Sequence, residues 1–163
     1  MVWIFDYIDL QLGDAKFPLE IALVNTIEPQ QCHIFYIKYP CNYFNNFSAK
    51  CVCNNHELSS WQEGETLYSA IHTITKQLIP NKYTEIIVSS YDKHRFLQPW
   101  FKNVIVFESL QKHILGVLPC ARHANDDKLC AKRECVRLML CYNDEIMYIN
   151  NPMSLCIHHT YKL

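Results

Sequence analysis

The sequence VWIFDYIDL, residues 2–10, decides the fold because it is an almost continuous run of apolar and aromatic residues. Val, Ile, Tyr, Phe and Trp are enriched in β-strands, so this run predicts a buried strand. Two further strands are expected directly behind it, at 18–24 and 33–38, with turn signals at Gly13 and Pro40. Three consecutive strands with short connections predict an antiparallel meander.

The rest of the chain alternates helical and strand patterns. Apolar residues at 67, 70, 71, 74 and 78 recur with the helical period, so we expect a helix that ends before Pro80. The expected segments after it are a strand at 85–90, a short helix at 92–101 that is broken near Pro99, a strand at 104–107, a short helix at 108–115 and a helix at about 125–142. The last helix carries Leu129, Val136 and Leu140 on one face, and the tail at 143–163 has weak strand character. A meander followed by strand–helix units predicts an α/β, ribonuclease-H-like (RNase H-like) fold, a mixed β-sheet flanked by α-helices.

Length and composition favour one globular domain spanning residues 1–163. Half of the residues are hydrophobic and 13% are aromatic, which excludes a disordered chain. The chain has only three Gly and lacks the GxGxxG, GxxxxGK[ST] and GxSxG motifs, so the main nucleotide-binding and serine-hydrolase classes lose their support. The net charge of −1 gives no global field that would attract nucleic acid, so any such binding must come from a local patch.

Cysteine usage indicates a reducing compartment, the nucleus or the cytoplasm. The nine Cys are an odd number, and no secretory signal pattern precedes the first expected strand, so we do not expect a secreted protein with a disulfide framework. No apolar run approaches the ~18–20 residues that a membrane span needs, so no membrane partner is expected.

The sequence PCARHANDDKLCA, residues 119–131, contains three good zinc ligands, Cys120, His123 and Cys130. His123 and Cys130 are seven residues apart, which is two turns of a helix, so on a helix they lie on one face. Thiolate and imidazole are the ligands that tetrahedral zinc prefers, but a structural site needs a fourth ligand and the nearby sequence offers none. The alternative is that these cysteines are buried and pack as small hydrophobic side chains.

Two stretches give the chain a resemblance to the Maelstrom domain, an RNase H-like domain related to DnaQ-type (DEDDh) 3′–5′ exonucleases. Residues 18–22, PLEIA, resemble the Pro-x-Glu-Ile-Gly motif of that family, and residues 120–131 resemble its Cys-x-x-His followed by Cys-Ala. The family's Glu-Cys-His-Cys set holds a structural zinc, so the resemblance implies that Glu20 is the fourth ligand beside Cys120, His123 and Cys130. Binding a metal would remove the cost of a carboxylate inside an apolar strand. Residues 89–92, SSYD, resemble the family's Ser-Asp-Asp region, and another divergent exonuclease-like domain is the alternative.

The carboxylates do not fit a two-metal exonuclease. Such an enzyme needs several carboxylates around two metal ions, and Asp6, Asp9 and Asp92 are the candidates. Its last motif needs an Asp five residues after His123, where this chain has Lys128, and the neighbouring Asp127 is turned by about 100° on a helix. Asp6 and Asp9 are otherwise interpreted as strand-end or turn carboxylates. We expect at most a weak single-strand-specific endoribonuclease whose catalytic residues the sequence does not identify.

The resemblance implies a role in Piwi-interacting RNA (piRNA) silencing of transposons, or in viral RNA control, through binding of single-stranded RNA. The candidate RNA-binding residues are basic: Lys93, Arg95, Arg122, Lys128, Lys132, Arg133 and Arg137. The last five lie on or beside the last expected helix, and Lys93 and Arg95 lie close to Tyr91 and Trp100, on which bases can stack. The alternatives are an ordinary solvated face and a non-catalytic protein-interaction module that keeps the fold and the zinc without binding RNA.

A rival metal cluster consists of Cys51, Cys53 and His56, with Cys41 as a fourth ligand. Cys-x-Cys places the two side chains on opposite sides of a strand, which is a poor chelate unless the backbone turns at Asn54-Asn55. Loop cysteines without a metal are the simpler interpretation.

Overall fold

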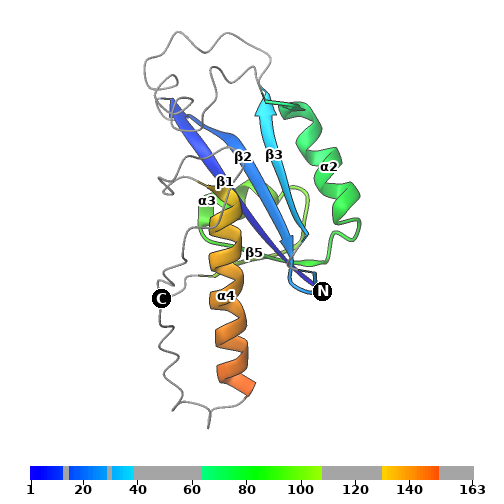
Figure 1. The fold of residues 1–163 in the computed structure, drawn as a ribbon. Coiled ribbons are helices and arrows are strands. Elements are labelled where there is room, and N and C mark those ends of the chain that lie inside the picture. Colours follow the sequence, from blue (N-terminus) through cyan, green and yellow to red (C-terminus); the bar gives the residue numbers. More distant parts are fainter. Residues whose placement is uncertain (13–14, 29–30, 39–63, 108–129, 151–163) are drawn as a thin grey trace.

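The computed structural model describes residues 1–12, 15–28, 31–38, 64–107 and 130–150 (Figure 1). These residues form an α/β structure in which helices cover both faces of a mixed six-stranded sheet. The strands are β1 (Val2–Leu12), β2 (Ala15–Asn25), β3 (Cys32–Lys38), β4 (Thr66–Leu67), β5 (Glu85–Val88) and β6 (Asn103–Val106), and their order across the sheet is β4-β3-β2-β1-β5-β6.

The predicted meander is confirmed. Strand β1 pairs antiparallel with β2, and β2 pairs antiparallel with β3. On its other side β1 pairs in parallel with β5, which in turn pairs in parallel with β6. Strand β1 therefore lies inside the sheet, which explains why its sequence is so apolar.

Alternate side chains of β1 pack into two separate hydrophobic cores, one on each face of the sheet. Trp3, Phe5 and Tyr7 pack against the face covered by α2 (Ile71–Leu78) and α3 (Tyr91–Leu97). Ile4 and Ile8 pack against α4 (Ala131–Asn150), which lies across the opposite face (Figure 1). Because side chains alternate along a strand, Asp6 is on the same face as Ile4 and Ile8 and points toward α4.

The helix expected at residues 67–78 begins later than its sequence period indicates. Thr66 and Leu67 form β4, which pairs in parallel with the end of β3, and a 3-10 turn (Tyr68–Ala70) leads into α2. Gly64 lies against the β3 backbone, where an added Cβ would be 2.4 Å from the Ile37 carbonyl oxygen. Backbone pairing with β3 takes the place of the first helical turn. Helix α3 corresponds to the short helix expected at 92–101, and it ends at Leu97, close to the break expected near Pro99.

Two predictions about the last helix are wrong, the second in part. Residues 143–150 continue α4 to Asn150 and do not form a strand. The buried residues of α4 are Ala131, Cys135, Leu138, Met139 and Cys141, and Val136 is partly buried against the same core, whereas Leu140 is 36% exposed. The predicted face therefore holds in part for Val136 and fails for Leu140, because the side chains that fit closely over β1 and β2 are the small Ala131 and Cys135. Residues 108–129, with the expected helix at 108–115, and residues 151–163 lie outside the described part. None of the helices described is both long and apolar enough to cross a membrane.

Candidate functional site

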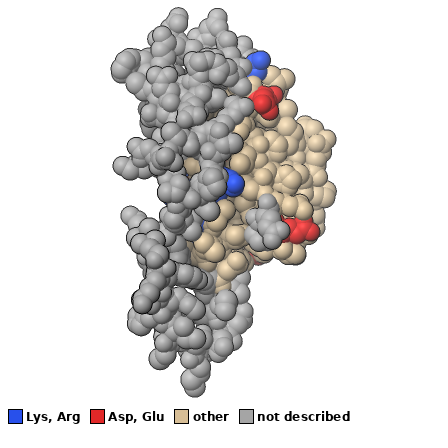
Figure 2. Space-filling view, viewed as in Figure 1, with Lys and Arg blue, Asp and Glu red and all other residues tan. Residues whose placement is uncertain are grey.

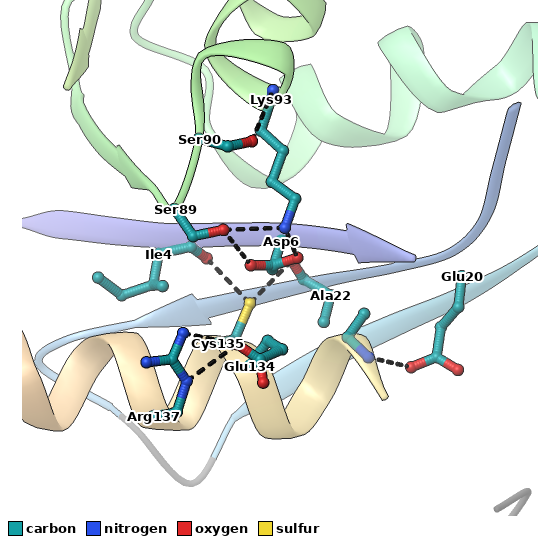
Figure 3. A network of polar contacts seen from close by, with 11 residues as sticks. Ile4, Asp6, Glu20, Ala22, Ser89, Ser90, Lys93, Glu134, Cys135 and Arg137 are labelled. Atoms are coloured by element: carbon teal, nitrogen blue, oxygen red, sulfur yellow. Dashed lines mark hydrogen bonds and ion pairs between the residues drawn. The ribbon is translucent and has the colours of Figure 1, made fainter. Parts of the chain in front are cut away.

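The main polar feature inside the described structure is a network around Asp6 in the middle of β1 (Figure 3). The Asp6 side chain is fully buried, so it is not the strand-end or turn carboxylate that the sequence indicated. The Lys93 ammonium group contacts Asp6 Oδ1 at 2.5 Å, and the Ser89 hydroxyl donates to Asp6 Oδ2 at 2.9 Å. Lys93 Nζ also donates to Ser89 Oγ at 2.8 Å, so the three side chains close a triangle of polar contacts.

The sheet register brings these residues together. Ile4 of β1 pairs with Ile87 of β5, and two residues further along both strands stand Asp6 and Ser89. Ser90 then begins α3, and its hydroxyl accepts from the Lys93 backbone N–H at 3.5 Å. This cap turns the chain so that Lys93, four residues after Ser89, reaches back to β1. The sequence motif SSYDK contains the signal for this cap, but the partner of Lys93 lies 87 residues away.

Burial controls the electrostatics of this network. Desolvation of the buried side chain raises the pKa of Asp6, while the charge and hydrogen bond of Lys93 and the hydrogen bond of Ser89 act in the lowering direction. The charge of Glu134 on α4 adds a smaller raising effect on the pKa of Asp6. The Lys93 side chain is 16% exposed, and its ammonium group also lies 5.6 Å from the centre of the Tyr7 ring. Lys93 is a predicted RNA-binding residue, but its ammonium group forms an ion pair with Asp6 inside the structure.

Helix α4 covers the sheet face on which Asp6 lies. The Cys135 thiol donates to the carbonyl oxygen of Ala22 at 3.3 Å and lies 3.9 Å from that of Ile4, between β1 and β2. Complete burial raises the pKa of this thiol well above its ordinary value, so Cys135 has a structural role and is no nucleophile at neutral pH. Also on α4, the Arg137 guanidinium donates two hydrogen bonds to the Glu134 carboxylate, at 2.7 and 2.9 Å.

The predicted zinc ligand Glu20 lies on β2, and its side chain reaches the start of α4. Its carboxylate is buried, and Oε1 accepts a hydrogen bond from the Ala131 backbone N–H at 2.9 Å, across 111 residues of sequence. Cys130 is 4% exposed and immediately precedes α4, so it is not itself part of that helix. Two of the four predicted ligands, Glu20 and Cys130, therefore lie at the same end of α4. Cys120 and His123 lie outside the described residues, as do Cys41, Cys51, Cys53 and His56 of the rival cluster.

The exposed polar residues at the other candidate site lie on and beside α3. Asp92 pairs with Lys16 of β2 and with Arg95, whose guanidinium contacts the carboxylate at 2.7 Å. Asp92 is thus a surface carboxylate, 40% exposed, and it does not join Asp6 in a metal site. A shallow hollow beside this pair is lined by Tyr7, Lys16, Asp92, Arg95 and Phe96. In the described part of the chain, His, Cys, Asp and Glu side chains do not converge in groups of three or more.

The basic residues described on α4 form a less exposed cationic surface than the sequence predicted. Lys132 and Arg133 are half-buried, and the Arg137 side chain, 26% exposed, pairs with Glu134. Among the described residues on the face shown in Figure 2, Lys and Arg side chains are sparse and form no continuous patch. Arg122 and Lys128 lie outside the described residues.

The fold and this site define an α/β protein with a mixed sheet and a buried acid–lysine pair on its central strand. Comparison with known proteins finds no matching family model, no matching curated protein and no matching solved structure. The resemblance to the Maelstrom domain therefore rests only on the short sequence motifs at residues 18–22, 89–92 and 120–131.

Proposed function

We propose that this chain is an RNase H-like domain of the Maelstrom kind that binds single-stranded RNA and is not a two-metal nuclease. The strand order supports the fold part of this proposal. A meander of β3, β2 and β1, followed by β5 and β6 in parallel with β1, is compatible with an RNase H-like sheet and supports this part of the proposal. The proposed setting is silencing of transposon or viral RNA in the nucleus or cytoplasm, as the resemblance implies.

The observation that carries the RNA proposal is the surface formed by α3 and the start of β2. Arg95 and Lys16 have side chains that are 72% and 44% exposed, and they line a hollow together with Asp92, Phe96 and the largely buried Tyr7. Tyr91, on the same helix, is 65% exposed. Single-stranded nucleic acid is bound by cations that follow the phosphates and by aromatic rings on which bases stack. The charges of both Asp92 and Asp9 act on Lys16, so two carboxylates balance the two cations, and the proposal rests on the exposure of Arg95, Lys16 and Tyr91.

The Asp6 network supports the absence of two-metal chemistry. A two-metal nuclease holds its ions with carboxylates that are available to them. Here Asp6 is neutralised by Lys93, and Asp92 pairs with Lys16 and Arg95 at the surface. Any cleavage of RNA by this chain should therefore be weak and independent of magnesium.

A structural zinc ion would be held by Glu20, Cys120, His123 and Cys130. With four protein ligands it would keep no open position, so its contribution would be to stability. The contact between Glu20 and the start of α4 supports this set, because it brings an oxygen ligand on β2 next to the segment that carries Cys130. Carboxylate, imidazole and thiolate are all accepted ligands of zinc.

Filter binding of single- and double-stranded RNA across a salt series tests the RNA proposal. We expect the wild-type chain to bind single strands in a salt-sensitive manner, and Arg95→Ala to weaken binding and lower the salt slope by about one phosphate contact. Tyr91→Ala should weaken binding by about 1–3 kcal/mol if a base stacks on this ring. Lys82→Ala is the matched control, because Lys82 is an exposed cation that lies 5.1 Å from the Tyr83 ring on another part of the surface.

Two results would contradict the RNA proposal. One is wild-type protein without salt-sensitive binding to single strands. The other is an Arg95→Ala variant that binds RNA no differently from the Lys82→Ala control. Either result would favour the alternative class, a protein-interaction module that has kept the fold.

A further inference from the structure

We propose that Trp100 and His72 form a platform on which bases of the single-stranded RNA stack, next to the hollow that Arg95 lines. This inference rests on the proposed RNA binding and deepens it. It extends the binding site from α3 to α2, and it assigns the bases of the strand to aromatic rings that carry no charge contact to the phosphates.

The platform is the outer end of a row of aromatic rings. The Phe96 ring lies 5.3 Å from the Tyr7 ring and 5.1 Å from the Trp100 ring, measured between centroids. The Trp100 ring in turn lies 4.9 Å from the His72 ring, at an interplanar angle of 34°. Because Tyr7 and Phe96 also line the hollow, the row begins at the hollow and leads from it to α2.

The fold sets the order of the rings. Phe96 belongs to α3, and Trp100 follows it by four residues. The Trp100 backbone N–H donates to the Leu97 carbonyl oxygen at 2.8 Å, so the chain keeps turning past the end of α3 and the two rings stay neighbours. His72 lies in the first turn of α2, which packs on the same face of the sheet as α3. Two helices therefore contribute to one row.

Exposure increases along the row. Tyr7 is 6% exposed and belongs to the hydrophobic core. Phe96 and Trp100 are half-buried against that core, and His72 is exposed. Packing on the core holds the rings in place while the outer end of the row is accessible to a ligand. A planar base can stack on such rings with little loss of side-chain freedom.

The charges along the row favour a nucleic-acid backbone. Neither α2 nor residues 93–102 contain an Asp or Glu, and the exposed Lys76 follows His72 by one helical turn. At the hollow, in contrast, the carboxylates of Asp9 and Asp92 act on Lys16. A strand that leaves the hollow along the row thus moves away from these carboxylates, toward a segment of the surface where its phosphates meet a cation.

A row of aromatic rings also suits a proline-rich peptide, which docks on such rings in the polyproline II conformation. The exposed cations Arg95 and Lys16 at the inner end of the row favour RNA, because a proline-rich peptide has no phosphates for them to bind. We therefore assign the row to RNA, and a proline-rich peptide serves as the competing ligand in the test.

Tryptophan fluorescence and filter binding with an oligouridylate of about eight nucleotides test this inference. We expect the RNA to quench the emission of the wild type, and Trp100→Phe to abolish this quenching while it keeps an aromatic ring in the core. His72→Ala should weaken binding by at least about fivefold and leave the salt slope unchanged, because a stacked ring contacts no phosphate. Tyr83→Ala, at an exposed ring outside the row, is the control and should change neither quantity.

The outcomes separate this inference from the RNA proposal itself. RNA binding that depends on Arg95 but is equal in His72→Ala and Tyr83→Ala would refute the platform and leave the proposed function intact. A wild type that binds no RNA would refute both, and quenching by a proline-rich peptide in place of RNA would assign the row to a protein ligand. If circular dichroism shows His72→Ala to be unfolded, the quenching comparison decides, and full quenching in Trp100→Phe overturns the inference.

Discussion

Removing one partner of the Asp6–Lys93 ion pair should cost far more stability than removing one partner of an ion pair at the surface. Asp6 is completely buried and Lys93 is 16% exposed, so replacing the lysine leaves a buried carboxylate without its counter-charge. We expect Lys93→Met to lower the free energy of unfolding at neutral pH by about 3–5 kcal/mol. Urea denaturation measures the loss, and Lys82→Met, at an exposed lysine, should change the free energy by less than about 0.5 kcal/mol.

The same variant makes a prediction about pH. Burial raises the pKa of Asp6 above its ordinary value, so the group's contribution to stability is fully present below the unfolded pKa and is lost as the pH rises through the folded pKa. Lys93 acts in the lowering direction, so without it the folded pKa of Asp6 rises further. The stability lost in Lys93→Met should therefore be small at about pH 4 and should grow toward neutral pH. Asp6→Asn/Lys93→Met should recover much of the loss and remove this pH dependence. A loss that is the same at both pH values would contradict this account.

At the scale of elements, the pairing of the edge strand β4 with β3 depends on Gly64, two residues before β4 begins. Gly64 is buried, and a Cβ at this position would lie 2.4 Å from the carbonyl carbon and oxygen of Ile37 and 2.7 Å from the Lys38 nitrogen. Because these are backbone atoms of β3, they cannot move aside as a flexible side chain does. We expect Gly64→Ala to push β4 away from β3 and to cost about 1–3 kcal/mol of stability.

Thermal unfolding and amide hydrogen exchange check this prediction. Protection should fall at Ile37 and Lys38, whose partners in β4 are Thr66 and Leu67, while β1 and β5 keep their protection. Ser69→Ala, at an exposed residue of the following 3-10 turn, is the control. A Gly64→Ala variant as stable as this control would show that the backbone contact is not limiting.

At the scale of the whole molecule, the proposed zinc ion would join β2 to the start of α4. The unfolded chain has no preformed site, so zinc binding contributes directly to folding. We expect Cys130→Ser to release the metal and to lower the melting temperature by about 10 °C or more. Glu20→Gln should have a smaller effect, because an amide oxygen can still ligate weakly and can still accept from the Ala131 backbone N–H.

Elemental analysis of the purified variants measures the metal. The wild type should carry one zinc ion per chain, and Cys53→Ser should keep it, because Cys53 belongs to the rival cluster. A wild type without zinc, or loss of zinc only when Cys51 or Cys53 is changed, would refute both the ligand set and the resemblance that implied it.

The sequence by itself determined five of the six strands of the sheet, all except β4. The meander of β1 to β3, the short strands β5 and β6 and the α/β class all follow from local patterns of apolar residues, since a strand in the middle of a sheet needs apolar side chains on both faces. The helical period also predicted α2 and α4. It did not determine where α2 begins or which face of α4 is buried, because those depend on the β3 edge and on the close fit of Ala131 and Cys135 over the sheet.

Only the tertiary structure decided the roles of the charged residues. In the sequence Asp6 was a candidate metal ligand or a turn carboxylate, and Lys93 a surface cation beside Tyr91. The parallel register of β1 and β5, followed by the cap at Ser90, brings the two charges together across 87 residues. No local pattern encodes such a pair, because the cost of a buried charge is relieved by whichever group the fold brings within reach.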